Sequence, residues 1–206
     1  MPIPFDPSFV LDLADKLGII QAVKGKLLRQ PDEAADKLVI VLDELSKVFT
    51  TIEAELVRYL SLNFDPEENL ADERETLLTL EGGQLAARVG EARGHCHKID
   101  NIYHKHLQRW FHSVLNPGEA QLVEDVFIDL SNADGGFIRV LDELADWLTT
   151  QATETLDLVD SQQFDAANQR VRAARKEVLP VRRSIAKAQT DLRNLQAEFI
   201  QASGTA

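Results

Sequence analysis

The 206-residue sequence is 44% hydrophobic and has one cysteine, which excludes a disordered chain and an internal disulfide. Its net charge of −12 argues against non-specific binding of nucleic acid or anionic lipid by the molecule as a whole. The longest purely aliphatic run, residues 38–42, is far shorter than the roughly 20 residues that a transmembrane helix needs. Because no signal-peptide pattern is present, we expect a cytoplasmic protein.

The first predicted helix covers residues 8–29. Apolar residues at helical spacing line one of its faces: Val10, Leu13, Leu17, Ile20, Val23 and Leu27. This segment carries four basic and two acidic residues, so its charge is +2 in an otherwise acidic protein.

The second predicted helix covers residues 32–62. Its apolar residues alternate three and four positions apart, which is typical of a helix packed at a shallow angle on its neighbours. They are Leu38, Leu42, Leu45, Phe49, Ile52, Leu56 and Tyr59.

A third helical segment covers residues 66–115, where Gly82-Gly83 either breaks the helix or bends it. Its apolar seam reads Leu85, Val89, Ala92, Cys96, Ile99, Tyr103, His106 and Trp110. The seam position of His106 predicts a buried histidine, and that of Cys96 predicts a buried, inert thiol.

The fourth helical segment, residues 118–160, has a turn signal at residues 132–136 where we expect a bend. Its apolar residues are Leu122, Val126, Leu130, Ala133, Phe137, Leu141, Leu144 and Leu148. Residues 119–165 carry twelve acids and one base, a net charge of −11.

The longest seam predicts a last helix over residues 162–202, kinked near Pro180 because proline removes a backbone donor. It reads Phe164, Ala167, Val171, Ala174, Val178, Val181, Ile185, Ala188, Leu192, Leu195 and Phe199. We therefore predict an all-α protein with one domain over residues 1–206. Its fold is an up-and-down antiparallel bundle of about five helices, several of them 30–40 residues long with coiled-coil-like seams.

Three histidine-region residues could bind a metal ion. His97, Asp100 and His104 are spaced three and four residues apart, so they share one helix face, and imidazole and carboxylate are ligands for zinc or ferrous iron. The alternative is a solvated polar face on which Asp100 pairs with His104. On such a polar face no metal is bound. We expect no cofactor.

A basic stretch on the last helix is a candidate contact for a protein partner or an anion. Residues 170–193 carry eight bases and two acids. The candidate contacts are Arg170, Arg172, Arg175, Lys176, Arg182, Arg183 and Lys187. Pairing with the acidic preceding helix would also explain this stretch without any ligand. Because base-stacking aromatic residues are absent from it, we expect no nucleic-acid partner.

No phosphate-binding loop, dinucleotide motif, paired cysteine motif or nucleophile elbow occurs in the sequence, so we expect no enzymatic activity. The favoured hypothesis is an interaction or assembly module that binds a protein partner or a second copy. An alternative is a conditional membrane-active bundle with peripheral membrane contact through its first helix. That contact would use Leu13, Leu17, Ile20, Lys24 and Lys26. A metal-binding bundle is the other alternative.

Overall fold

A computed structural model of the protein describes residues 8–29, 33–131 and 136–203. Over these residues the chain is all-helical, with no strand. The helices are α1 (Ser8–Leu27), α2 (Glu33–Leu60), α3 (Leu70–Glu81), α4 (Gly83–Ile102), the π-helical turn η1 (Tyr103–Leu107), α5 (Gln108–Val114), α6 (Pro117–Ser131), α7 (Phe137–Asp160) and α8 (Phe164–Ser203). None of the described helices is both long and apolar enough to cross a bilayer.

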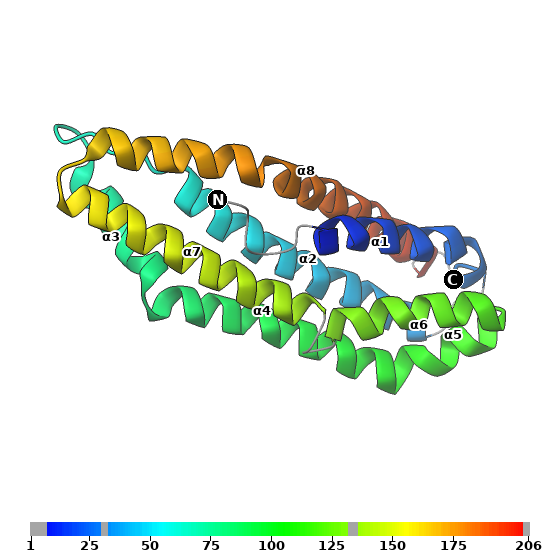
Figure 1. The fold of residues 1–206 in the computed structure, drawn as a ribbon. Helices are drawn as coiled ribbons and strands as arrows, with labels where there is room; N and C mark the ends of the chain where they lie inside the picture. The colour runs from blue at the N-terminus through cyan, green and yellow to red at the C-terminus, as the bar shows by residue number, and fades with distance from the viewer. Residues whose placement is uncertain (1–7, 30–32, 132–135, 204–206) are drawn as a thin grey trace.

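The helices lie side by side along one long axis (Figure 1). α2 packs against α8 on one side and against α4 on the other, while α7 packs against α3, α4 and α8. At the opposite end of the bundle from α3, α1 packs between α8 and α6. Two of the predicted helical segments are divided in the structure. Segment 66–115 forms α3, α4, η1 and α5, and segment 118–160 contains α6 and α7. The prediction of about five helices is therefore not met exactly.

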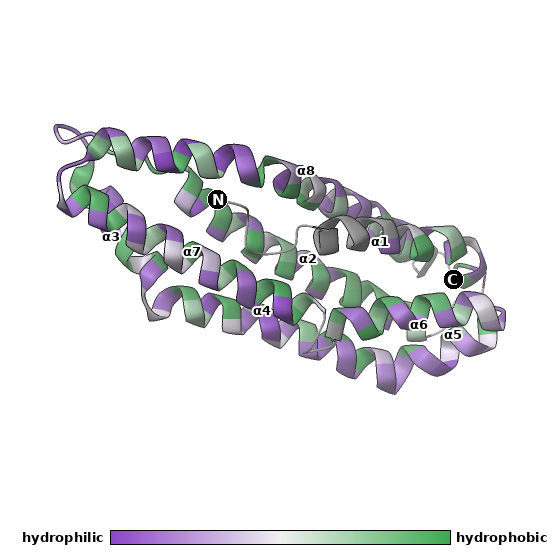
Figure 2. Cartoon of the chain, in the orientation of Figure 1, coloured by the Kyte–Doolittle hydropathy of each residue, from purple (hydrophilic) through white to green (hydrophobic). Residues whose placement is uncertain are grey.

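Burial of the predicted seams holds the bundle together. All seven seam residues of α2 are buried, and so are ten of the eleven on α8, the exception being the partly buried Phe164. Hydrophobic and hydrophilic bands recur along each long helix in Figure 2. α8 runs as one continuous helix through Pro180, so the predicted kink there stays a prediction.

Gly82 breaks the third predicted helix rather than bending it. Its backbone is extended, with φ −97° and ψ −174°, so α3 ends at Glu81 and α4 begins at Gly83. The predicted bend at 132–136 falls mostly outside the described residues. Gly136 is also extended, so α7 begins as a separate helix at Phe137.

The predicted seam of α6 is wrong at Leu122, which is 51% exposed. The face of α6 that packs in the core instead carries Val123 and Phe127 together with Val126 and Leu130. Leu122 lies one residue away from this face, and one residue turns an α-helix by about 100°.

The π-helical turn η1 corrects the predicted seam at His106. Tyr103, Leu107, Phe111 and Leu115 are buried at steps of four residues, and His106 is exposed. Four residues overshoot one α-helical turn by about 40°, so three such steps would carry the seam away from the core. The wider π turn absorbs the extra residue and keeps the seam in phase.

The helix α1 is bound to the end of the bundle by apolar contacts and ion pairs. Leu17, Ile20, Val23 and Leu27 are buried, as predicted for its apolar face. Three lysines join it to its two neighbours: Lys16 pairs with Asp129 of α6, Lys26 with Glu119 of α6, and Lys24 with Glu198 of α8. The side chain of Leu13 lies outside the described residues. The proposed membrane residues 17, 20, 24 and 26 therefore contact the bundle in this structure.

We expect Leu107→Ala to destabilise the fold by about 2–5 kcal/mol, because it empties a buried site in the seam. His106→Ala, one residue away and exposed, should change stability by less than about 0.5 kcal/mol. Urea denaturation of both variants measures the difference. Equal effects of the two substitutions would contradict the π-helical register.

Candidate functional site

The three predicted metal ligands do not form a ligand set. Nε2 of His104 lies 3.3 Å from Oδ1 of Asp100, so these two side chains contact each other along one helix face. His97 is exposed on the same helical segment. Among the described residues, no group of three or more His, Cys, Asp or Glu side chains is placed to hold a metal ion.

The other residues of the histidine region also have ordinary structural surroundings. Nε2 of His112 lies 3.5 Å from a carboxylate oxygen of Glu124, at the surface. Cys96 is buried, as predicted, and burial raises the pKa of its thiol to about 12. The thiolate that a nucleophile or redox site needs is therefore not formed near neutral pH.

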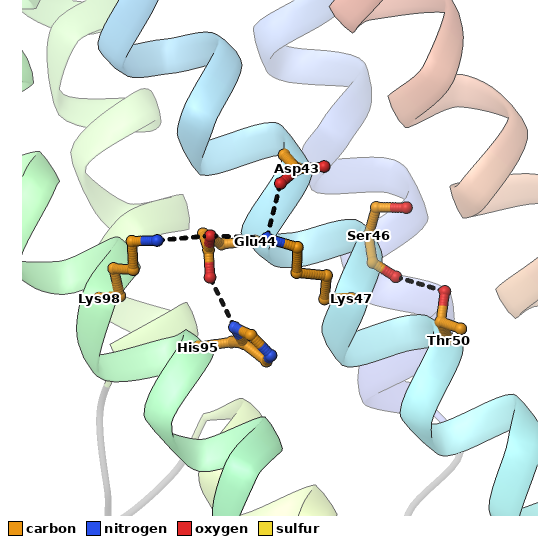
Figure 3. Close-up of polar contacts among 7 residues, drawn as sticks. All are labelled: Asp43, Glu44, Ser46, Lys47, Thr50, His95 and Lys98. Atoms are coloured by element: carbon orange, nitrogen blue, oxygen red, sulfur yellow. Dashed lines mark hydrogen bonds and ion pairs between the residues drawn. The ribbon is translucent and has the colours of Figure 1, made fainter.

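A buried carboxylate joins α2 to α4 in the middle of the bundle (Figure 3). Glu44 is 2% exposed, and one of its oxygens accepts hydrogen bonds from the amines of Lys98 at 2.7 Å and Lys47 at 3.0 Å. Nδ1 of His95 lies 2.5 Å from the other oxygen. Burial alone would raise the pKa of Glu44, but these hydrogen bonds outweigh it and lower the pKa from 4.5 to about 2.

A second buried glutamate on α2 is neutralised in the same way. Glu55 is also 2% exposed, and the guanidinium of Arg88 from α4 contacts both of its carboxylate oxygens, at 2.6 and 2.9 Å. Neither glutamate is among the residues predicted from the sequence. The signal was their spacing of 11 residues, which is three helical turns and places both on the side of α2 that faces α4.

The basic stretch of α8 is divided by the fold into two sets, and the first set is used inside the molecule. Nε and Nη2 of Arg175 donate to the backbone carbonyls of Leu60 and Leu62, at 2.5 and 3.2 Å. They satisfy acceptors at the C-terminal end of α2, where a positive charge also complements the helix dipole. Arg182 pairs with Glu53 of α2 at 2.6 Å, and Arg170 pairs with Glu154 of α7.

The second set is exposed, and we call it the α8 basic stripe: Arg172, Lys176, Arg183 and Lys187. Within the part of the chain that the structure describes, none of these four side chains has a carboxylate partner. Their spacing of 4, 7 and 4 residues puts them within about 60° of the helix circumference, along about 22 Å. Leu179, which is 43% exposed, lies in the middle of this stripe.

Comparisons with protein families, curated proteins and solved structures found no match to this chain.

We expect Glu44→Gln to destabilise the protein by about 1–3 kcal/mol near pH 7, because a neutral amide replaces the buried carboxylate that binds Lys47, Lys98 and His95. The lowered pKa means that the Glu44 carboxylate stabilises the fold above about pH 4.5 and loses this effect as pH falls toward about 2. The difference between wild type and variant should therefore shrink over that range in urea denaturation at several pH values. Asp36→Asn, at an exposed position of α2, is the control. A difference that is as large at pH 3 as at pH 7 would contradict this account.

The two sets of α8 cations should differ in their effect on stability. We expect Arg175→Ala to cost about 1–3 kcal/mol, because it removes donors from carbonyl groups at the end of α2. Arg172→Ala should cost less than about 0.5 kcal/mol, because its side chain is exposed and unpaired. Thermal unfolding of the two variants compares them, and a reversed order would show that the division is wrong.

Proposed function

We propose that the protein is a non-enzymatic interaction module that binds an acidic protein surface through the α8 basic stripe. The observation that carries the proposal is the unpaired state of these four cations. In a protein with a net charge of −12, acidic side chains are abundant. Even so, the fold leaves these cations without a partner while it pairs the three neighbouring arginines on the same helix.

The arrangement of the stripe favours a helical or extended protein segment as the partner. Four cations in a straight row of about 22 Å match carboxylates repeated along one face of a helix. Leu179 in their middle offers one apolar contact of the kind that adds affinity to a charged interface. The stripe contains no aromatic side chain on which a base could stack, so a nucleic acid fits it less well.

The titratable groups inside the bundle support a binding role rather than a catalytic one. Glu44 and Glu55 are already neutralised by cations of α4. The thiol of Cys96 is buried and protonated at neutral pH. These groups stabilise the bundle, so we assign binding to exposed side chains such as those of the α8 basic stripe.

Binding of a fluorescent 20-residue alanine–glutamate helix, followed by fluorescence anisotropy at low salt, tests the proposal. We expect Lys176→Glu combined with Arg183→Glu to weaken binding at least about tenfold, since two attractive charges become repulsive. The same measurement with a single-stranded RNA oligonucleotide and with anionic phospholipid vesicles tests the two other classes of polyanion.

The matched control combines Lys105→Glu with Arg109→Glu, which changes the net charge by the same amount at exposed cations of η1 and α5. This control should bind the acidic peptide as the wild type does. Equal loss in both double variants would indicate a general charge effect and would refute the α8 basic stripe as the site. Stripe-dependent binding of RNA or vesicles, but not of the peptide, would also refute the proposal.

A further inference from the structure

We infer that the partner of the α8 basic stripe is an acidic surface on α3 of a second copy of this chain. This inference rests on the proposed function, because it assigns the occupant of the same stripe. It is argued from a second set of unpaired charges, opposite in sign to the first and located on a different helix.

The acidic surface is defined by four exposed carboxylates on α3 and on the turn before it. We call it the α3 acidic face: Glu67, Glu68, Asp72 and Glu75. Over the described residues, none of these carboxylates has a basic side chain as its partner. Leu78, which is 43% exposed, follows Glu75 by three residues and extends this face along the helix.

The neighbouring charges of α3 are used inside the molecule, just as they are on α8. Arg74 pairs with Asp160 of α7 at 2.9 Å, and Glu73 accepts hydrogen bonds from Asn63 and Asn69. The four carboxylates of the α3 acidic face are therefore left over after the internal contacts have been made.

The two surfaces complement each other in charge and in composition. The stripe has four unpaired cations around one exposed leucine, and the face has four unpaired carboxylates beside one exposed leucine. In one molecule, α7 packs against both α3 and α8, and no ion pair joins the α3 acidic face to the α8 basic stripe. Contact between the two therefore requires two molecules.

The contact joins different surfaces of identical chains, so it is isologous in a reciprocal dimer and heterologous in a head-to-tail chain. Each copy keeps one surface of each kind, so the assembly either closes as a reciprocal dimer or grows as a chain. Since the attraction is between exposed charges, it should weaken strongly with ionic strength.

Light scattering and analytical ultracentrifugation at about 0.05 M and about 0.5 M salt test the inference. We expect the wild type to self-associate at the lower salt concentration and to be monomeric at the higher. Lys176→Glu with Arg183→Glu, or Asp72→Lys with Glu75→Lys, should weaken self-association at least about tenfold, since each reverses two of the four charges of one surface and so removes its net attraction for the other.

Mixing the two double variants gives the sharpest measurement. One variant keeps the intact α3 acidic face and the other keeps the intact α8 basic stripe, so each fails alone but the mixture contains one complete pair of surfaces. We expect the equimolar mixture to form mixed complexes with about the affinity of the wild type. Loss of folding cannot produce this recovery, and circular dichroism checks the helix content of each variant separately.

Two control variants keep the net charge of the test variants. Lys105→Glu with Arg109→Glu matches the change on α8, and Glu91→Lys with Asp146→Lys matches the change on α3, all at exposed positions. Both should self-associate as the wild type does.

A wild type that stays monomeric at low salt, or a mixture that stays monomeric, would overturn the inference. If the wild type then still bound the acidic peptide through the α8 basic stripe, the proposed function would stand with a different acidic partner. If neither self-association nor peptide binding depended on the stripe, both proposals would fail.

Discussion

Two carboxylates buried on one helix fix how the bundle is assembled. Glu44 and Glu55 lie three turns apart on α2, and ionised carboxylates are stable at such buried positions only where cations reach them. The cations come from α4, at Lys98 and Arg88, so α2 and α4 fit in one antiparallel register. A slip of one helical turn would separate both carboxylates from their partners together. The apolar seams alone would tolerate such a slip far better, because one turn replaces aliphatic residues with similar ones.

The same requirement separates structural from available charge on α8. A guanidinium that lies beside the end of α2 or beside an acid of α7 makes an internal hydrogen bond or ion pair, as Arg175 and Arg170 do. A cation a quarter turn further round the helix, as at Lys176, meets no carboxylate within the described residues. Both kinds look alike in the sequence. The stripe is therefore a product of helix rotation, and its regularity follows from the seam that buries the opposite side of α8.

The spacing of apolar residues could predict most of the fold. An alternation of three and four positions indicates a helix, and the residues that follow it line the one face that must be buried. It could not predict the seam at His106, where a π turn changes the number of residues per turn and leaves no mark in composition. It also misplaced Leu122, where two candidate faces differed by one residue. For the candidate site, the basic residues of α8 could be predicted from the sequence. Which of them are paired inside the molecule and which are exposed and unpaired could not. That division depends on which helices lie beside α8, and helix order around a bundle is set by three-dimensional packing.

The position of α1 has a consequence for synthesis. Its lysines 16 and 24 pair with Asp129 and Glu198, which lie 113 and 174 residues further along the chain. At roughly 5–20 residues per second, a ribosome needs about 9–35 s to reach Glu198 after it has made Lys24. During that interval the apolar face of α1 lacks its contacts with α8. Nascent α1 is therefore a segment whose apolar face a chaperone would shield until α8 has been made.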